Sequence, residues 1–227
     1  MAGEMGWIRI TRAVVVAIGV GMAGVAAAQA ARLPTVGGAD FLGHAASPEA
    51  QSVAQWAVDA RNAQGKPFAV VDKKQARIFV FTADGRLTGT TAVLLGQAKG
   101  DESAPGVGQR VATGIPVEQR TTPAGRFDSE PGHNNKGEAI VWVDYDAAIA
   151  IHRLRPAPAA QRRPERLASA LPEDRRISLG CIVVSPAFYD DVVAPILGRQ
   201  RGVVYVLPES RGIDLVQASQ AGGSRLY

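Results

Sequence analysis

Short runs of β-branched and aromatic residues recur through the middle and the end of this chain. Three of them come close together, at residues 68–73, 76–83 and 86–95. Asp84-Gly85, between the second and third runs, is a strong hairpin signal. Four further runs follow, at residues 138–145, 147–152, 180–184 and 202–209. The pattern predicts one domain rich in β-strands.

Helical spacing of apolar residues occurs at two places around these strands. Ser47 is a candidate N-cap and Pro48 suits the first helical turn, before an apolar stripe made of Val53, Trp56, Ala57 and Ala60. Ser185 and Pro186 repeat this start signal ahead of a second stripe, Phe188, Val192, Val193 and Ile196. We therefore expect one helix in front of the strands and one just before the last strand.

The first thirty residues have the pattern of a secretory signal peptide. Arg9 and Arg12 precede an apolar run at residues 13–27, and Ala28-Gln29-Ala30 is a cleavage site of the A-x-A type. At about fifteen residues the run is shorter than the roughly twenty that a membrane span needs, although an uncleaved anchor is the alternative. We expect export, cleavage before Ala31 and no stable membrane span afterwards.

Composition and charge exclude several classes of function. The 25 basic and 21 acidic residues give a net charge of +4 with no block of like charges, so we expect no nucleic acid partner. The glycine-rich residues 96–109 lack the Lys-Ser/Thr of a phosphate-binding loop. Three scattered histidines and one cysteine offer no metal-ligand spacing. We therefore expect neither a metal nor another cofactor.

The single cysteine, Cys181, is the strongest candidate for chemistry. In an exported protein it cannot form an internal disulfide, so it is either a small buried apolar residue or a reactive thiol. Gly180 before it permits a tight turn, in which the amides of Gly180 and Cys181 can form an oxyanion hole. Of the possible bases, His152 ends an apolar run, whereas His44 and His133 lie in polar or linker segments. An ordinary core or capping role for His152 stays open at this point.

Four stretches of the sequence resemble the YkuD-type L,D-transpeptidases. They are residues 122–127 (TPAGRF), 144–153 (Asp-Tyr through His-Arg), 176–182 (RISLGCI) and 186–189 (PAFY). The resemblance implies a mainly β fold with minor α structure, a mixed β-sandwich of the L,D-transpeptidase catalytic domain type preceded by one helix. It also implies a division into signal peptide (1–30), linker and N-terminal helix (31–66), catalytic domain (67–209) and C-terminal tail (210–227).

The same resemblance implies roles for individual residues. Cys181 would be the nucleophile that forms a thioester with a peptidoglycan stem peptide, and His152 its base. The nucleophile loop would be Ser178, Leu179 and Gly180. Apart from the resemblance, the arginine-rich spacer between His152 and Ser178 is a candidate lid whose guanidinium groups, among them those of Arg153 and Arg176, would hold stem-peptide carboxylates. The implied function is cell-wall cross-linking or anchoring in the periplasm or envelope of a bacterium, with carbapenem-type inhibitors as further partners.

Two positions depart from the family pattern. Leu179 stands where the family has a second histidine, and Val183 stands where it has Asn or Arg. These departures keep open a catalytically degenerate envelope binding protein as an alternative. A peptidoglycan L,D-peptidase or amidase that uses the same acyl-enzyme is a second alternative, because the nucleophile does not decide whether an amine or water accepts the acyl group. The arginine-rich spacer can equally be a solvated surface loop.

Overall fold

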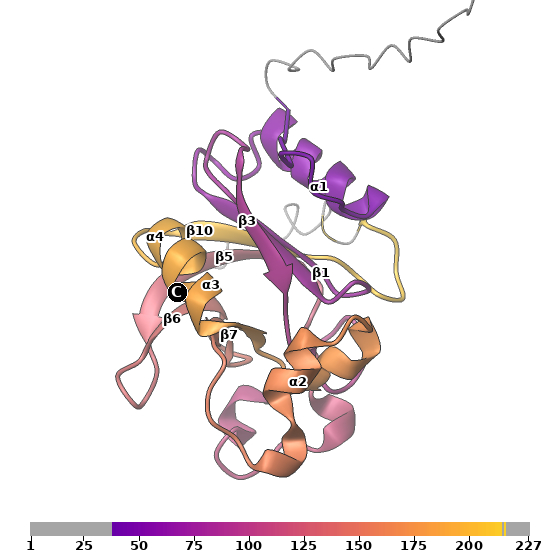
Figure 1. Ribbon diagram of the computed structural model, residues 1–227, viewed down its shortest axis with the longest axis vertical. Coiled ribbons are helices and arrows are strands. Elements are labelled where there is room, and N and C mark those ends of the chain that lie inside the picture. Colours follow the sequence, from indigo (N-terminus) through magenta and orange to yellow (C-terminus); the bar gives the residue numbers. More distant parts are fainter. Residues whose placement is uncertain (1–37, 215, 217–227) are drawn as a thin grey trace, which may run out of the picture. The chain divides into compact units, whose positions relative to one another are not determined.

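The computed structural model describes residues 38–214 and 216. The predicted signal peptide, residues 1–30, and residues 217–227 of the predicted tail lie outside the described residues. An eight-stranded sheet dominates the described part, with strand order β3-β2-β1-β10-β5-β6-β7-β9 (Figure 1). Its strands are β1 (Phe68–Asp72), β2 (Arg77–Phe81), β3 (Leu87–Ala92), β5 (Gly125–His133), β6 (Ala139–Asp144), β7 (Ile149–Arg153), β9 (Ile182–Val184) and β10 (Gly202–Val206).

The sheet is mixed. β1 pairs with β10, and β7 with β9, in parallel, whereas the other five pairings are antiparallel. A separate pair of short strands, β4 (Leu95–Gly96) and β8 (Arg176–Ser178), is parallel. The structure therefore confirms a mainly β fold with minor α structure and one helix in front of the strands.

Alternation along the strands produces two hydrophobic cores. Within β1, Phe68 and Val70 point to the core beneath helix α1 (Pro48–Asp59), and Ala69 and Val71 point to the other core. The second core also contains residues from the opposite end of the sheet, such as Ile151 of β7. The two ends of the sheet thus pack face to face across one interior, as in a β-sandwich.

The helices begin where their capping residues indicate. Ser47 accepts a hydrogen bond from the Ala50 amide at 3.1 Å, and Pro48 occupies the first turn of α1. Ser185 likewise accepts from the Phe188 amide at 3.2 Å and starts the second predicted helix. That helix is interrupted by one π-helical stretch, so it divides into α3 (Pro186–Phe188), the π-helix Tyr189–Val193 and α4 (Ala194–Ile196).

The structure contains elements that hydrophobic periodicity did not predict. They are β5, β8, helix α2 (Arg163–Ala168) and four 3₁₀ helices at Gly108–Arg110, Val117–Gln119, Ala159–Gln161 and Pro172–Arg175. β5 was missed because Gly, Pro and charged residues fill its sequence and few of its side chains are buried. The arginine-rich spacer, expected to be a loop, contains α2.

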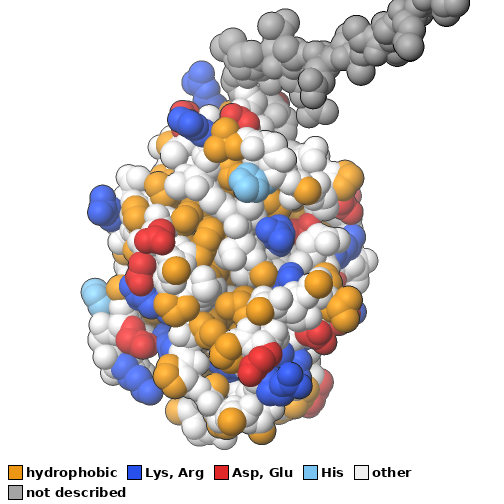
Figure 2. Space-filling view, in the orientation of Figure 1, with side chains coloured by type: hydrophobic (Ala, Val, Ile, Leu, Met, Phe, Trp, Pro, Cys, Tyr) orange, Lys and Arg blue, Asp and Glu red, His pale blue; other side chains and the backbone are white. Residues whose placement is uncertain are grey.

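Charges of both signs are interspersed with hydrophobic side chains over the face drawn in Figure 2. Among residues 38–214 and 216, no helix has the length and apolar character needed to cross a membrane.

Candidate active site

Strand pairing brings Cys181 next to the strand that carries His152. Cys181 immediately precedes β9, and β9 runs parallel to β7 with Ile182 opposite Ile151 and Val183 opposite His152. The two candidate catalytic residues are 29 positions apart in the sequence, yet they lie on neighbouring strands at one edge of the sheet.

Gly180 is required by the backbone of the turn before Cys181. Its φ of +135° is in a region that side chains with a Cβ rarely adopt. A Cβ built there would lie 2.7 Å from Ile149 Cδ1 and 2.8 Å from the carbonyl oxygen of Thr121. Both observations explain why glycine precedes the cysteine.

Buried hydroxyl groups hold this turn in place. Ser178 donates from its hydroxyl to the Cys181 carbonyl at 2.7 Å and accepts from the Gly180 amide at 3.1 Å. The hydroxyl of Thr122, which is fully buried, donates to the Gly180 carbonyl at 2.7 Å. The TPAGRF stretch thus begins with a residue that anchors the nucleophile turn, and it contributes no side chain to the cavities described below.

The two amides expected to form an oxyanion hole differ in whether they are already hydrogen-bonded. The Gly180 amide is already bonded to Ser178 Oγ. The Cys181 amide makes no hydrogen bond within the described part of the chain. An oxyanion at this site would therefore find the Cys181 amide as its first available main-chain donor.

His152 is buried, with 8% of its surface exposed, and its ring is oriented by the main chain. Its Nδ1 lies 2.7 Å from the carbonyl oxygen of Arg153. Because a carbonyl oxygen only accepts, this contact assigns the proton to Nδ1 and leaves the lone pair on Nε2. Burial, followed by the positive charge of Arg155, lowers the pKa of His152 to about 4. The imidazole is therefore neutral at pH 7, as a general base must be.

The Cys181 side chain is an uncharged thiol, just as the His152 imidazole is uncharged. Its Sγ donates to the carbonyl oxygen of Ala148 at 3.4 Å, and the described residues show no hydrogen bond between Cys181 and His152. Burial raises the pKa of the Cys181 thiol, while the Ala150 backbone and the charge of Arg155 act in the opposite direction. The thiol and the imidazole are thus both uncharged near pH 7.

Cys181 and His152 lie at the boundary of two cavities. The larger, about 610 Å³, extends over the aromatic pair Trp142 and Tyr145, whose ring centroids are 5.0 Å apart, and the β5–β6 turn. The smaller, about 190 Å³, is lined by apolar side chains including Ile115 and by two arginines. Residues shared by both cavities are Val111, Ala148, His152, Arg155 and Cys181.

The two arginines predicted to bind substrate lie elsewhere. Arg153 donates to Asp190 from Nε at 2.9 Å, and its guanidinium lies 4.0 Å from the centre of the Tyr189 ring. Arg176 contacts Glu209 and donates to the carbonyl oxygen of Lys73. Neither residue lines a cavity that contains Cys181.

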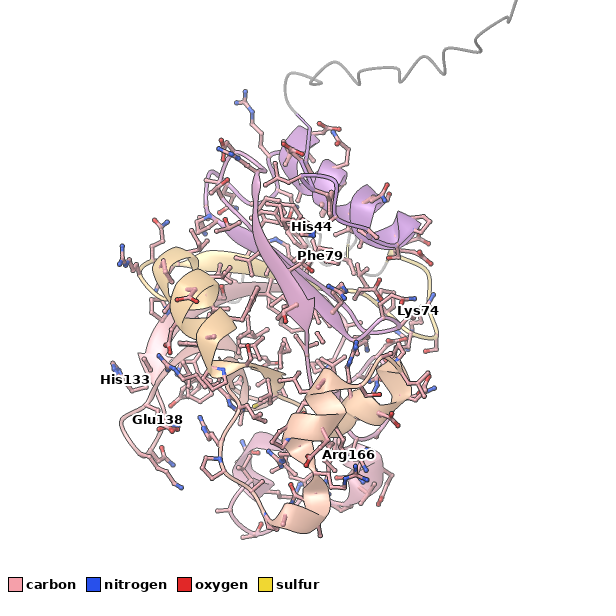
Figure 3. All side chains as sticks on the ribbon, viewed as in Figure 1. His44, Lys74, Phe79, His133, Glu138 and Arg166 are labelled. Carbon is pink, nitrogen blue, oxygen red and sulfur yellow. The ribbon has the colours of Figure 1, made fainter. Side chains whose placement is uncertain are left out.

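Of the other residues singled out in the sequence, some line a cavity that contains Cys181 and others do not. Ser178 and Leu179 line the smaller cavity with Cys181. Figure 3 places His44 beside Phe79 and His133 at the β5–β6 hairpin, and neither histidine lines a Cys181 cavity. Only His152 among the three is in position to act on the thiol.

Arg155 and Arg163 are the residues that sequence reasoning passed over. Both belong to the arginine-rich spacer, but nothing in the spacing of its seven arginines separated them from their neighbours. Arg155 follows the end of β7, where strand alternation no longer predicts direction, and α2 sets the direction of Arg163. No cluster of three potential metal-ligating side chains occurs in residues 38–214 and 216.

Comparison with known proteins gives similarity to solved structures alone. No family model and no curated protein matches the chain. Similar structures include the helical cell shape determining protein Pgp2 from Campylobacter jejuni, at 16% identity and a TM-score of 0.41 over 64% of this chain and 49% of that one. The chain spans about half the length of the Pgp2 structures it matches.

Two further similar structures belong to enzymes. An L,D-transpeptidase from Mycobacterium smegmatis is 18% identical with a TM-score of 0.36, covering 62% of this chain and 58% of that one. The catalytic domain of the E. faecium L,D-transpeptidase is 19% identical with a TM-score of 0.36, covering 63% of this chain and 98% of that one. Several of the similar structures are thus L,D-transpeptidases, the family that the sequence motifs resemble.

Proposed function

We propose that this protein transfers acyl groups between peptidoglycan stem peptides through a thioester on Cys181. The observation that carries the proposal is the juxtaposition of the only cysteine with a neutral, oriented His152 at the boundary of two cavities. The motifs around both residues supply the substrate class, because they resemble those of L,D-transpeptidases. A half-buried thiol near a buried neutral imidazole is an arrangement suited to nucleophilic catalysis.

The first half of the reaction forms the acyl-enzyme. Nε2 of His152 accepts the thiol proton while Sγ bonds to the carbonyl carbon of the donor amide. The resulting oxyanion accepts a hydrogen bond from the Cys181 amide. The carbon–nitrogen bond then breaks, and His152 returns the proton to the leaving amine, which leaves a thioester on Cys181.

The second half transfers the acyl group to an amine. The acceptor amine attacks the thioester carbonyl and gives a proton to His152, and the departing sulfur takes that proton back. The cavities that meet at Cys181 offer space for the donor and, once the amine has left, for the acceptor. If water takes the place of the amine, the same acyl-enzyme makes the protein an L,D-peptidase or amidase.

A catalytically degenerate binding protein is the second candidate. The observation that favours it is the resting state of Cys181, whose thiol bonds to Ala148 and whose pKa is raised by burial. A protein of this kind would keep the larger cavity for peptidoglycan fragments without forming a thioester.

The proposal places the protein in the periplasm or cell envelope of a bacterium. Its support is the signal-peptide pattern of residues 1–30, with a mature chain from Ala31. N-terminal sequencing of the envelope form tests it. A chain that begins at Met1 in the cytoplasm would contradict export.

Mass spectrometry of peptidoglycan fragments tests the reaction itself. Purified protein incubated with disaccharide-tetrapeptides should produce cross-linked dimers and release one amino acid per cross-link. Release without dimers would identify the peptidase instead. Binding of fragments without any release would favour the degenerate binding protein. Cys181→Ala is the matched control and should give neither dimers nor release.

A further inference from the structure

The smaller cavity beside Cys181 contains two arginines that face the same space. Arg155 lies two residues after the end of β7, and Arg163 is the first residue of α2. Both are half-buried and line this cavity together with His152 and Cys181. Two cations therefore lie beside the proposed nucleophile without an acidic residue in the lining of the cavity.

The hydrogen-bonding groups of these arginines are largely unused. Arg155 contacts Glu138 through Nε at 2.8 Å, and Glu138 lies at the exposed β5–β6 hairpin (Figure 3). Arg163 donates from Nε to the neutral amide oxygen of Gln161 at 2.6 Å. Within the described residues, the terminal guanidinium nitrogens of both arginines make no hydrogen bond. Four nitrogen donors thus remain free for a ligand.

The electrostatics of the cavity are unfavourable when it is empty. Burial, and then the charge of Arg155, lower the pKa of Arg163, and the charges of both arginines lower the pKa of His152. Glu138 offsets them in part through its contact with Arg155, whereas Arg163 forms no ion pair with the described residues. A half-buried cation without a counterion is costly, and an anion between the two guanidinium groups would remove that cost for Arg163.

We propose that the smaller cavity is a carboxylate-binding subsite in which Arg155 and Arg163 hold a carboxylate of the substrate beside Cys181. Guanidinium groups match the planar, two-oxygen geometry of a carboxylate better than any other side chain does. That the carboxylate belongs to a peptide rests on the proposed function. The charge and geometry of the subsite do not.

The size of the cavity limits what the carboxylate is attached to. A volume of about 190 Å³ is the space of about six water molecules in the liquid. It holds a carboxylate with the single small residue that bears it, and the remainder of a peptide must lie in the larger cavity of about 610 Å³. The subsite therefore selects a carboxylate close to the bond that Cys181 attacks.

The neighbouring Arg162 provides a matched control. It carries the same charge in the same segment, but it is exposed and lines a different cavity with Glu165, Arg166 and Asp174. Charge neutralisation at Arg162 changes the net charge as much as it does at Arg163, without altering the subsite.

Calorimetric binding to the full chain carrying Cys181→Ala tests the proposal without turnover. The probe is the tetrapeptide L-Ala-D-isoglutamine-L-Lys-D-Ala, whose only carboxylate is C-terminal, and its C-terminal carboxamide. The carboxamide should bind roughly ten- to a hundredfold more weakly, the usual loss of a charge-assisted contact. Arg163→Gln or Arg155→Gln should bring the ratio close to one, Arg163→Lys should retain part of it, and Arg162→Gln should leave it unchanged.

Several outcomes would overturn the subsite. They are equal binding of the two peptides, no measurable binding of either, or an equal effect of Arg162→Gln and Arg163→Gln. Failure of the proposed function gives a different result, because a carboxylate preference without acylation of the intact cysteine leaves the subsite standing. Acylation without a carboxylate preference overturns the subsite alone.

Discussion

Two polar pairs in this molecule differ in how far their hydrogen-bonding groups are satisfied by the protein itself. Lys73 and Asp101 form an ion pair of 2.9 Å with 0% and 2% of their side chains exposed. Lys73 also donates to the carbonyl oxygens of Gly100 and Thr122, and Asp101 accepts from the amides of Glu209 and Ser210. His152 is buried and Cys181 is half-buried, but they do not bond to each other, and cavities adjoin both.

The difference separates a structural pair from a pair that suits the proposed chemistry. The groups around Lys73 and Asp101 satisfy each other, so the pair joins β1, the glycine-rich loop, the TPAGRF stretch and the segment after β10. Through Thr122 it also supports the turn of Gly180. Nε2 of His152 and the Cys181 amide remain available beside empty space, as a group that acts on a ligand must be.

The largest expected effect is the loss of covalent chemistry in Cys181→Ala. A carbapenem has a strained carbonyl that a thiolate can attack, so the wild-type protein should gain one inhibitor mass by intact-protein mass spectrometry. Cys181→Ala should gain none, because it has no other cysteine. An adduct on the variant, or none on wild type, would contradict a nucleophilic Cys181.

The next effect concerns the base. His152→Ala should lower the rate of carbapenem acylation about 10²–10⁴-fold, the usual contribution of a positioned general base. His44→Ala and His133→Ala are matched controls that should leave the rate unchanged, because neither lines a Cys181 cavity. Similar losses from all three variants would show that the structure around His152 is not what sets the rate.

Breaking the structural pair should cost stability instead. Lys73→Met leaves the Asp101 carboxylate buried without its cation, which typically costs about 3–5 kcal/mol. Urea unfolding measures this cost. The adjacent Lys74→Met should change stability by less than about 0.5 kcal/mol, because Lys74 is exposed and its pairing with Glu49 at 3.5 Å is a surface contact. Equal effects of the two variants would erase the contrast between the regions.

Sequence patterns predicted the strands that bury most of their side chains. Residues 68–73, 76–83, 138–145 and 202–209 each contain a strand, and Asp84-Gly85 forms the β2–β3 turn with Gly85 at a φ of +85°. Periodicity did not predict β5 and α2, because their residues contribute little to either core. Periodicity reports burial, so an element with few buried residues leaves no periodic signal.

In the candidate site, too, residues with a local sequence signal were predicted, and residues placed by the tertiary structure were not. The placement of Cys181 after Gly180 and of His152 at a strand end is local, and both were predicted as a pair from sequence. Which arginine faces the cysteine depends on where α2 lies, and Arg155 and Arg163 occupy the place expected of Arg153 and Arg176. The burial of Lys73 depends on Asp101, 28 residues away, so it has no local signature.

Acidification should weaken the fold through His152. Its pKa is about 4 in the folded protein and about 6.5 in an unfolded chain, so the unfolded state binds more protons between these values. Its contribution to stability is therefore complete above pH 6.5, falls as the pH drops to 4, and changes no further below that. The loss should be on the order of 3 kcal/mol by urea unfolding at pH 7 and pH 4. His152→Gln should remove most of this pH dependence. If His152→Gln loses as much stability between pH 7 and pH 4 as the wild-type protein does, other titrating groups cause the loss.

The smallest effect concerns Val183, the departure that suggests a missing polar contact next to the nucleophile. Its side chain is 1% exposed, its amide and carbonyl are both bonded to Leu94, and it forms part of the apolar wall of the smaller cavity. Val183→Asn would place a polar amide at this buried position in the apolar wall. We therefore expect a loss of about 1–3 kcal/mol in stability, the cost of a buried polar group with incomplete hydrogen bonds, and less than about a tenfold change in acylation rate. Val111→Asn is the control, since Val111 lines the same cavity with 45% of its surface exposed and should tolerate the amide. A Val183→Asn variant that is as stable as wild type and faster in acylation would contradict this expectation. It would show that a polar group in the cavity faces position 183 without a hydrogen-bond partner, and that valine there lowers the activity.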